Sequence, residues 1–191
     1  MGGRRASLSF PCDDGLVRRI AVIGNGGGGK STLARVLAEH LHIPVHEVDE
    51  VQWLPGWRRA PLDEVADTLE AWASEESWII DGFGPWPVID RRMARADTIV
   101  YVDFPFRIHL WWAAKRQVAS FVSGRAWGGQ SVPPSSLLLF RALRRVHAMR
   151  PDLRELVTKS GRDAKLVHLR SPREMERWVS DVTRTAAGVG D

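Results

Sequence analysis

The sequence predicts an α/β fold in which helices cover both faces of a parallel sheet. Apolar strand patterns alternate with helix patterns along most of the 191 residues, which is typical of sheets built from successive β-α-β units. Two of the apolar runs lead directly into Asp81-Gly82 and Asp103. Buried parallel strands often end in this way at the sheet edge where ligands bind.

The first half of the chain contains three predicted strands and two predicted helices. The strands cover residues 19–23, 45–48 and 78–80. The first helix follows residue 32, and its apolar residues at helical spacing are Leu33, Val36, Leu37 and Leu41. The second strand ends at Asp49. A second helix opens at Pro61, because proline favours the first helical position, and its apolar stripe is Leu62, Val65, Leu69 and Trp72.

The second half of the chain continues the alternation. Strands are predicted over residues 98–102 and 165–169, and helices over residues 105–121 and 137–149. Residues 123–136 are rich in Gly, Ser and Pro, and the helix after them stops before Pro151. A capping box from Ser171 to Glu174 begins the closing helix, whose buried face is Met175, Trp178, Val179 and Val182.

The composition is that of one globular domain. Hydrophobic residues make up 44% and charged residues 26% of the chain. No apolar run approaches the ~18 residues of a membrane span, and no secretion signal is recognisable, so we expect a cytoplasmic protein without a membrane partner. Cys12 is the single cysteine, which excludes an intramolecular disulfide. We expect the domain to span residues 17–185, between flexible termini at 1–16 and 186–191.

A glycine-rich run lies between the first strand and the helix that follows it. It matches the pattern G-x-x-x-x-G-K-[ST] and consists of Gly24, Asn25, Gly26, Gly27, Gly28, Gly29, Lys30, Ser31 and Thr32. Glycines allow positive φ angles that turn successive N–H groups into one concavity, where they bind a polyphosphate at the positive end of the helix. We expect Lys30 to reach the β- and γ-phosphates and the Ser31 hydroxyl to ligate Mg²⁺.

The charges are segregated along the chain. No acidic residue occurs between Asp103 and Asp152, and the basic residues there are Arg107, Lys115, Arg116, Arg125, Arg141, Arg144, Arg145 and Arg150. Three interpretations remain open. The segment is a mobile lid that brings guanidinium groups to a migrating phosphoryl group, a surface for nucleic-acid phosphates, or a solvated helix face.

Several segments resemble one protein family. They are Ile20-Ala21-Val22-Ile23-Gly24 with the glycine-rich loop, Val48-Asp49, Trp53-Leu54-Pro55-Gly56-Trp57, Trp78-Ile79-Ile80-Asp81-Gly82, Ala96-Asp97-Thr98-Ile99-Val100 and Val167-His168-Leu169-Arg170-Ser171. Together they look like the small P-loop proteins labelled DNA topology modulation proteins, which are similar to adenylate, nucleotide and shikimate kinases. The resemblance spans about residues 18–182. It implies a three-layer P-loop kinase fold with a parallel five-stranded sheet in the order 2-3-1-4-5, ATP as donor, Mg²⁺ and a lid. The acceptor-side insertion would be about residues 50–77 and the lid region about 115–150.

The same resemblance assigns roles to individual residues. Residues 24–32 match the donor phosphate loop, and Asp81 matches the aspartate of adenylate kinases that holds water on Mg²⁺. A carboxylate at the end of an apolar strand suits a divalent ion that keeps most of its waters. Asp81 is alternatively a turn residue before Gly82. Asp103 is either a rival ligand or the N-cap of the next helix.

The acceptor side departs from the adenylate kinase pattern. There the Asp-Gly-Phe segment continues with Pro-Arg, and that arginine holds the acceptor's phosphate, whereas here the run is Asp81-Gly82-Phe83-Gly84-Pro85-Trp86. AMP is therefore a doubtful acceptor. Arginines that could replace the missing one are Arg58, Arg59, Arg91 and Arg92. The acceptor is alternatively a small hydroxylated molecule met by Asp49 or Glu50, with Asp49 as hydrogen-bond acceptor or base.

Tryptophans mark the same region. Trp53, Trp57 and Trp86 are placed to stack on a base or ring of the acceptor, although most of the nine tryptophans must serve packing. Trp72, Trp78 and Trp178 fall on apolar stripes and are expected in the core. The six histidines have no metal-binding spacing.

The leading hypothesis is an ATP- and Mg²⁺-dependent kinase for a small-molecule acceptor, similar to nucleotide kinases. The glycine-rich loop and Lys30 would bind the donor, Ser31 and Asp81 would organise Mg²⁺, and Arg116 or Arg125 would close over the transferring group. The acceptor residues would be Asp49, Trp53, Trp57, Arg58 and Arg91. The alternatives are a P-loop NTPase or regulator that acts on nucleic acid, and a nucleotide binder without turnover.

Overall fold

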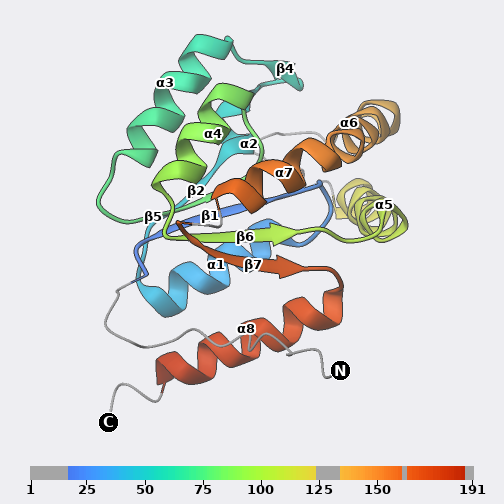
Figure 1. Cartoon of the computed structure of the whole chain (residues 1–191). Helices are drawn as coiled ribbons and strands as arrows, with labels where there is room; N and C mark the ends of the chain where they lie inside the picture. The colour runs from blue at the N-terminus through green and yellow to red at the C-terminus, as the bar shows by residue number, and fades with distance from the viewer. Residues whose placement is uncertain (1–16, 124–133, 161–162, 188–191) are drawn as a thin grey trace.

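A five-stranded parallel sheet forms the centre of the protein, seen here in a computed structural model that describes residues 17–123, 134–160 and 163–187 (Figure 1). Its strands are β1 (Arg19–Gly24), β2 (Val45–Glu47), β5 (Trp78–Asp81), β6 (Thr98–Val102) and β7 (Lys165–Leu169). They lie in the order β2-β5-β1-β6-β7, and all four pairings are parallel. Numbered within this sheet, that is the predicted order 2-3-1-4-5.

Helices cover both faces of the sheet, as predicted. One face carries α1 (Lys30–Leu41) and α8 (Pro172–Ala187), and the other carries α3 (Leu62–Ala73), α4 (Trp86–Arg95) and α7 (Arg150–Ser160) (Figure 1). The remaining two long helices, α5 (Phe106–Ser123) and α6 (Ser136–Ala148), lie beyond the ends toward which β6 and β7 point. This arrangement leaves the carboxyl edge of the sheet between α5, α6 and the segment that follows β2.

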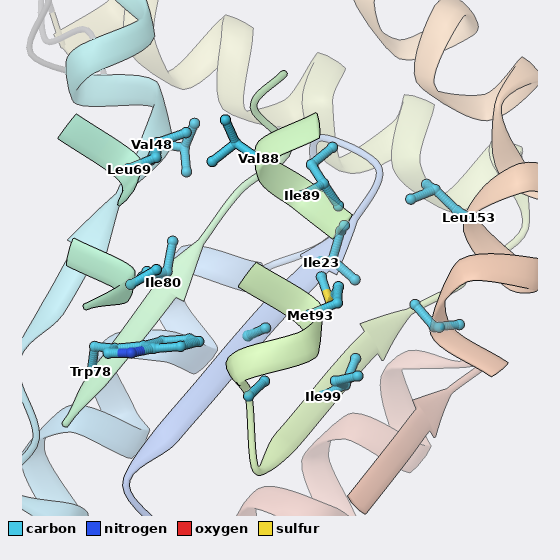
Figure 2. Packing of buried hydrophobic residues seen from close by; sticks show 14 of the residues in the cluster. Ile23, Val48, Leu69, Trp78, Ile80, Val88, Ile89, Met93, Ile99 and Leu153 are labelled. Atoms are coloured by element: carbon cyan, nitrogen blue, oxygen red, sulfur yellow. The ribbon is translucent and has the colours of Figure 1, made fainter. Parts of the chain in front are cut away.

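The side chains of β1 alternate between two hydrophobic cores. Ile20 and Val22 pack with α1 and α8, where Trp178 is fully buried. Ala21 and Ile23 pack toward α3, α4 and α7 (Figure 2). Because both faces of the central strands are covered, these strands are continuous apolar runs rather than alternating ones.

The region after β2 differs from the prediction in two ways. The strand ends at Glu47, and Asp49 lies in the first turn of the short helix α2 (Val48–Gln52) rather than at a strand end. The chain turns here because Val48 is fully buried against Gly82, where an added Cβ would lie 2.7 Å from the Val48 Cβ. The second difference is a short hairpin of β3 (Trp53–Leu54) and β4 (Arg58–Arg59), which was not predicted.

Prolines begin two helices that the sequence analysis did not predict. Pro87 lies in the first turn of α4, and Pro151 is the second residue of α7. A proline in the first turn costs no hydrogen bond, since those N–H groups have no partner within the helix. Pro151 therefore does more than end the preceding helix: it lies in the first turn of a new one.

Other boundaries are close to the predictions. Helix α5 extends two residues past the predicted end at 121, and α6 is shifted by one residue, with the Ser135 hydroxyl accepting a hydrogen bond from the Leu138 N–H at 3.2 Å. Leu62 is 65% exposed rather than part of the buried stripe of α3. The predicted capping box is half-formed, because the Glu174 carboxylate accepts from the N–H of Arg170 rather than from that of Ser171. Among the described residues, no helix is both long and apolar enough to cross a lipid bilayer.

Candidate active site

The glycine-rich run forms the connection between β1 and α1. Gly27 has a φ of +69°, and a Cβ at this position would lie 2.7 Å from the carbonyl oxygen of His109. A side chain is excluded there for both reasons. The helix begins at Lys30, so the loop sits at the positive end of α1, where backbone N–H groups favour an anion.

Two buried polar side chains hold the loop from behind. Asn25 donates from Nδ2 to the carbonyl of Leu143 in α6 at 3.0 Å, and its Oδ1 accepts from the N–H of Gly26 at 2.8 Å. His109 in α5 places Nδ1 3.0 Å from the carbonyl oxygen of Gly26. Burial and the nearby charge of Lys30 lower the pKa of His109 to about 4. The ring is therefore neutral near pH 7 and donates its Nδ1–H, and the loop is tied to both α5 and α6.

Lys30 lies across its own loop. Its Nζ donates to the carbonyl oxygen of Asn25 at 3.1 Å, five residues earlier in the chain. The ammonium group thus lies at the concave side of the run, where it meets a bound phosphate as a point charge.

Ser31 and Asp81 are joined at the edge of the loop. β5 pairs with β1 so that Asp81 stands beside Val22, and the Ser31 hydroxyl donates to Asp81 Oδ2 at 2.6 Å. Asp81 is only 4% exposed, and its Oδ1 is buried without a hydrogen-bond partner among the described residues. Burial raises the pKa of Asp81, while Lys30 and the Ser31 hydrogen bond oppose this shift.

This pair of oxygen ligands fits a divalent cation. A buried carboxylate with an unpartnered oxygen is stabilised by a positive charge beside it, and Mg²⁺ prefers one or two protein oxygens together with water and phosphate. Within the described ranges, no group of three or more His, Cys, Asp or Glu side chains is arranged to hold a metal. The residues present therefore fit Mg²⁺ that enters with a nucleotide rather than an all-protein metal centre.

A cavity of about 490 Å³ opens in front of the glycine-rich loop, which is within the size range of small-molecule sites. Residues 24–32 form its floor, and Asp81 lies beside them. One wall is the apolar face of α6, with Leu138, Leu139, Ala142, Leu143, Val146 and Met149. The facing residues come from the end of β2, from α2, the β3–β4 hairpin, α3, the loop after β5 and the start of α4. They include Glu47, Asp49, Gln52, Trp53, Trp57, Arg59, Leu62, Val65, Phe83 and Trp86.

The aromatic residues of this cavity form two pairs. Trp53 and Trp57 contact edge to face with ring centroids 5.8 Å apart, and Phe83 and Trp86 do so at 5.7 Å. The guanidinium of Arg59 lies over the Trp53 ring at 4.9 Å from its centroid. The structure therefore brings Asp49, Trp53 and Trp57 to the cavity, as the sequence hypothesis required. Trp72, which was predicted in the core, is half-buried; it packs against the core cluster and stacks on His46.

Several candidate arginines lie elsewhere. Arg91 pairs with Glu70 at 3.3 Å, and Arg58 is exposed with its Nε 3.4 Å from the Pro55 carbonyl; neither lines the cavity. The helical turn of α4 and the tight hairpin therefore place these two side chains outside the cavity lining. Arg92 is instead fully buried, and its Nη2 donates to the carbonyl of Gly82 at 2.8 Å.

One of the two lid candidates lines the cavity, and the other lies outside the described residues. Arg116 lines the cavity from α5, and Arg145 lines it from α6. Partial burial lowers the pKa of Arg116, while the nearby carboxylates of Asp49 and Asp81 oppose this. The predicted lid residue Arg125 lies outside the described residues, as does most of the segment 123–136.

Asp103 is neither a metal ligand nor a helix cap. Its carboxylate accepts hydrogen bonds from Arg150, from Arg154 at 2.8 Å and from His168 at 2.9 Å. It lies outside the lining of the large cavity. The two arginines come from α7, which the sequence analysis did not predict, and so their pairing with Asp103 could not be foreseen.

Sequence analysis assigned no role to two residues of the site, His109 behind the loop and Leu143 in the apolar wall. Arg92, one of the candidate acceptor arginines, instead lies beneath the turn after β5. One sequence signal could have found Leu143. The apolar residues of 137–149 recur at helical spacing, which indicates an apolar helix face that packs against another part of the protein or lines a site. A lone histidine and a lone arginine carry no such signal.

The fold is shared with known small-molecule kinases. Shikimate kinase from Acinetobacter baumannii, in complex with shikimate, matches with a TM-score of 0.56 and 15% identity over 91% of this chain and 90% of that chain. Shikimate kinase from Bacteroides thetaiotaomicron matches with a TM-score of 0.51 and 14% identity over 89% of this chain and 98% of that chain. A gluconokinase from Sinorhizobium meliloti 1021 matches with a TM-score of 0.50 and 18% identity over 91% of this chain and 96% of that chain. This chain has a P-loop kinase fold. No protein-family model matches it, and no curated protein sequence is significantly similar to it.

Proposed function

We propose that the protein is an ATP- and Mg²⁺-dependent kinase that transfers the γ-phosphoryl group to the hydroxyl of a small-molecule acceptor. The observation that carries the proposal is the contact between Ser31 and Asp81 at 2.6 Å, beside a phosphate loop that opens into a cavity of about 490 Å³. The loop supplies a donor site, and the aromatic wall of the same cavity supplies space for a second substrate. The P-loop kinase fold supports this reading.

The proposed donor site consists of the glycine-rich loop, the start of α1 and arginines from α5 and α6. The N–H groups of residues 25–29 and the Lys30 ammonium would bind the phosphates of ATP. Ser31 and Asp81 would hold Mg²⁺, which when bound neutralises phosphate charge and orients the γ-phosphoryl group. Arg116 and Arg145 line the same cavity, and we propose that they stabilise the charge that develops on the transferring group. Arg125 stays in the proposal as a lid residue.

The acceptor site lies on the facing wall. Asp49, at the start of α2, would accept a hydrogen bond from the acceptor hydroxyl and take its proton during transfer. Trp53 and Trp57 would bound the acceptor's ring. The sequence resemblance to DNA topology modulation proteins supports the nucleotide-kinase-like assignment, and we propose segment 50–77 as the acceptor side and 115–150 as the lid region.

The nucleic-acid alternative rests on the basic segment that follows Asp103. A surface for nucleic-acid phosphates needs exposed, clustered cations, and Arg107, Lys115, Arg141 and Arg144 are exposed, whereas Arg116 and Arg145 also line the cavity and Arg150 binds Asp103. The phosphate loop itself is common to kinases and NTPases. The loop alone does not separate the two functions. They differ in what stimulates ATP turnover, which is a small acceptor for the kinase and DNA or RNA for the NTPase.

Phosphoryl transfer from γ-labelled ATP tests the proposal. The protein is incubated with Mg²⁺, labelled ATP and a panel of nucleosides, nucleoside monophosphates and hydroxy acids, in parallel with duplex DNA and RNA. Labelled product with at least one small acceptor, lost in Lys30→Ala, is the expected result. Turnover stimulated by DNA or RNA and by no acceptor would contradict the kinase proposal and support the NTPase.

A further inference from the structure

We infer that the acceptor is a neutral compound with a flat ring and a free hydroxyl, of the nucleoside class, rather than one that carries a phosphate or carboxylate. This inference rests on the proposed kinase function and concerns the acceptor wall, here defined as Glu47, Asp49, Gln52, Trp53, Trp57, Arg59, Phe83 and Trp86. Two properties of this wall point to it: the aromatic surface and the sign of the charges.

Four of the eight side chains of the acceptor wall are aromatic rings. Trp53 and Trp57 stand at the two ends of a tight turn, in contact at 5.8 Å and 65°. Trp57 has a φ of +60°, which is unusual for a bulky side chain, and Gly56 before it has a φ of +78°. This turn fixes the Trp57 ring against Trp53 at the cavity, although the backbone there is strained. Aromatic faces held in this way stack on flat rings with little further loss of freedom.

The charges of the acceptor wall oppose an anionic substrate. Glu47 and Asp49 contribute carboxylates, and Arg59 contributes a guanidinium. The Glu47 carboxylate forms an ion pair with Arg35, and Arg59 is positioned over the face of Trp53 at 4.9 Å, so its charge interacts with the ring. A phosphate or carboxylate at this wall would lie near the like charge of Asp49, whereas a hydroxyl donates a hydrogen bond to that carboxylate.

The arginines that could have held an acceptor phosphate point elsewhere. Arg91 is paired with Glu70, and Arg58 lies outside the cavity lining. Arg92 is close to the turn after β5, but it is buried and its Nη2 donates to the carbonyls of Gly82 and Phe83. It supports the aromatic pair from beneath rather than facing the cavity.

The other cations of the cavity lie at the donor site or next to the point of transfer. Lys30 lies in the phosphate loop and Arg145 comes from α6, whereas Arg116 of α5 lies near the carboxylates of both Asp49 and Asp81. In the transfer step a bond forms between the acceptor's hydroxyl oxygen and the γ-phosphorus, and the bond from that phosphorus to the β–γ bridging oxygen breaks. The hydroxyl proton passes to Asp49 and ADP leaves. A hydroxyl on a neutral ring compound supplies everything that this step needs.

Binding is tested separately from transfer. The full chain is saturated with Mg²⁺ and a non-hydrolysable ATP analogue, so that the donor site is filled, and is titrated with thymidine, thymidine monophosphate, adenosine, AMP, shikimate and gluconate. We expect the nucleosides to bind at least about tenfold more tightly than their monophosphates and the two hydroxy acids. Trp57→Ala should weaken nucleoside binding on the order of tenfold, in line with a lost stacking platform.

Three variants control this experiment. Trp57→Phe keeps a ring at the hairpin and should retain most of the affinity, which separates stacking from a folding defect. Trp111→Ala removes a tryptophan that is 68% exposed on α5 and should change nothing. Asp49→Asn removes one carboxylate and should narrow the preference for thymidine over its monophosphate, because repulsion of the phosphate is reduced.

The two proposals fail in different ways. Nucleoside binding that depends on Trp57, without phosphoryl transfer, would support the acceptor class and contradict the kinase function. Transfer to shikimate, gluconate or a monophosphate in preference to the nucleosides would overturn the acceptor class and leave the kinase function standing. Absence of nucleoside binding to the donor-filled protein overturns the acceptor class whatever the turnover.

Discussion

Replacing Asp103 by asparagine should remove a pH-dependent part of the stability. The Asp103 side chain is buried, and burial alone would raise the pKa of its carboxyl group. The hydrogen bonds from Arg150, Arg154 and His168 outweigh this effect and lower the pKa from 3.8 to about 2. These contacts join the end of β6 to the start of α7, and α7 directly follows the helix that walls the cavity.

The size of the effect follows from the pKa difference between the folded and unfolded chain. A change from 3.8 to about 2 corresponds to about 2 kcal/mol at 1.36 kcal/mol per unit. Because the folded pKa is the lower one, this stabilisation is complete well above pH 3.8 and is lost as the pH falls toward 2. Between pH 6 and pH 3, about 1 kcal/mol should be lost.

Urea unfolding at pH 6, 5, 4 and 3 measures this loss. The wild type should be more stable than Asp103→Asn at pH 6, and the difference in the free energy of unfolding should shrink by about 1 kcal/mol at pH 3. Asp163→Asn, which removes an exposed carboxylate, serves as the matched control with no such trend. A difference between wild type and Asp103→Asn that stays constant over this pH range would refute the reasoning.

Four further predictions concern the candidate active site. Lys30→Ala should lower kcat/KM at least about tenfold, because a charge-assisted bond of about 1.5–3 kcal/mol is lost, whereas Lys159→Ala on the surface should retain full activity. Asp81→Asn should reduce Mg²⁺-dependent activity more than nucleotide binding without metal, as measured by titration with and without Mg²⁺; equal losses would instead indicate a structural turn. Gly27→Ala should abolish ATP binding in calorimetry, since its Cβ would lie 2.7 Å from a carbonyl oxygen, and normal affinity would contradict the loop geometry. Arg116→Ala should lower kcat more than it raises the KM for ATP, because its contact strengthens in the transition state; the opposite pattern would make it a ground-state binder.

The centre of the sheet could be predicted from the sequence because its strands are nearly continuous apolar runs. Residues 98–102 and 165–169 were predicted at the bounds that the structure has. Every residue of β6 is buried, since the strand is covered on both faces, whereas the edge strand β7 includes the partly exposed Lys165 and His168. The glycine-rich loop was equally predictable, because the chemistry of phosphate binding requires its glycines and the Lys30-Ser31 pair.

The missed elements have local sequences that do not determine them. Helix α4 follows Pro85 and contains Pro87 and three arginines, so its local sequence indicates an irregular segment. Packing of Val88, Ile89 and Met93 against the sheet makes it helical (Figure 2). The β3–β4 hairpin has only two residues in each strand. Such short strands carry no periodicity.

The site was predictable where chemistry limits the choice of residue and not where long-range contacts decide. The resemblance to P-loop kinases assigned Ser31 and Asp81 to the same Mg²⁺, and their side chains meet at 2.6 Å. The arginines were not separable in this way. Arg91 and Arg92 are neighbours in the sequence, yet one pairs with Glu70 on the surface and the other is fully buried, because successive residues of a helix face different directions.

Phosphorus NMR of a complete reaction mixture tests the central claim most directly. The wild-type protein is incubated with ATP, Mg²⁺ and a nucleoside, and the fate of the γ-phosphorus is followed. We predict that the γ-signal of ATP decreases while a phosphomonoester signal and the signals of ADP increase in equal amounts, and that Lys30→Ala shows no conversion. Appearance of inorganic phosphate in place of the phosphomonoester, with every acceptor tried, would contradict the kinase function and identify the protein as an NTPase.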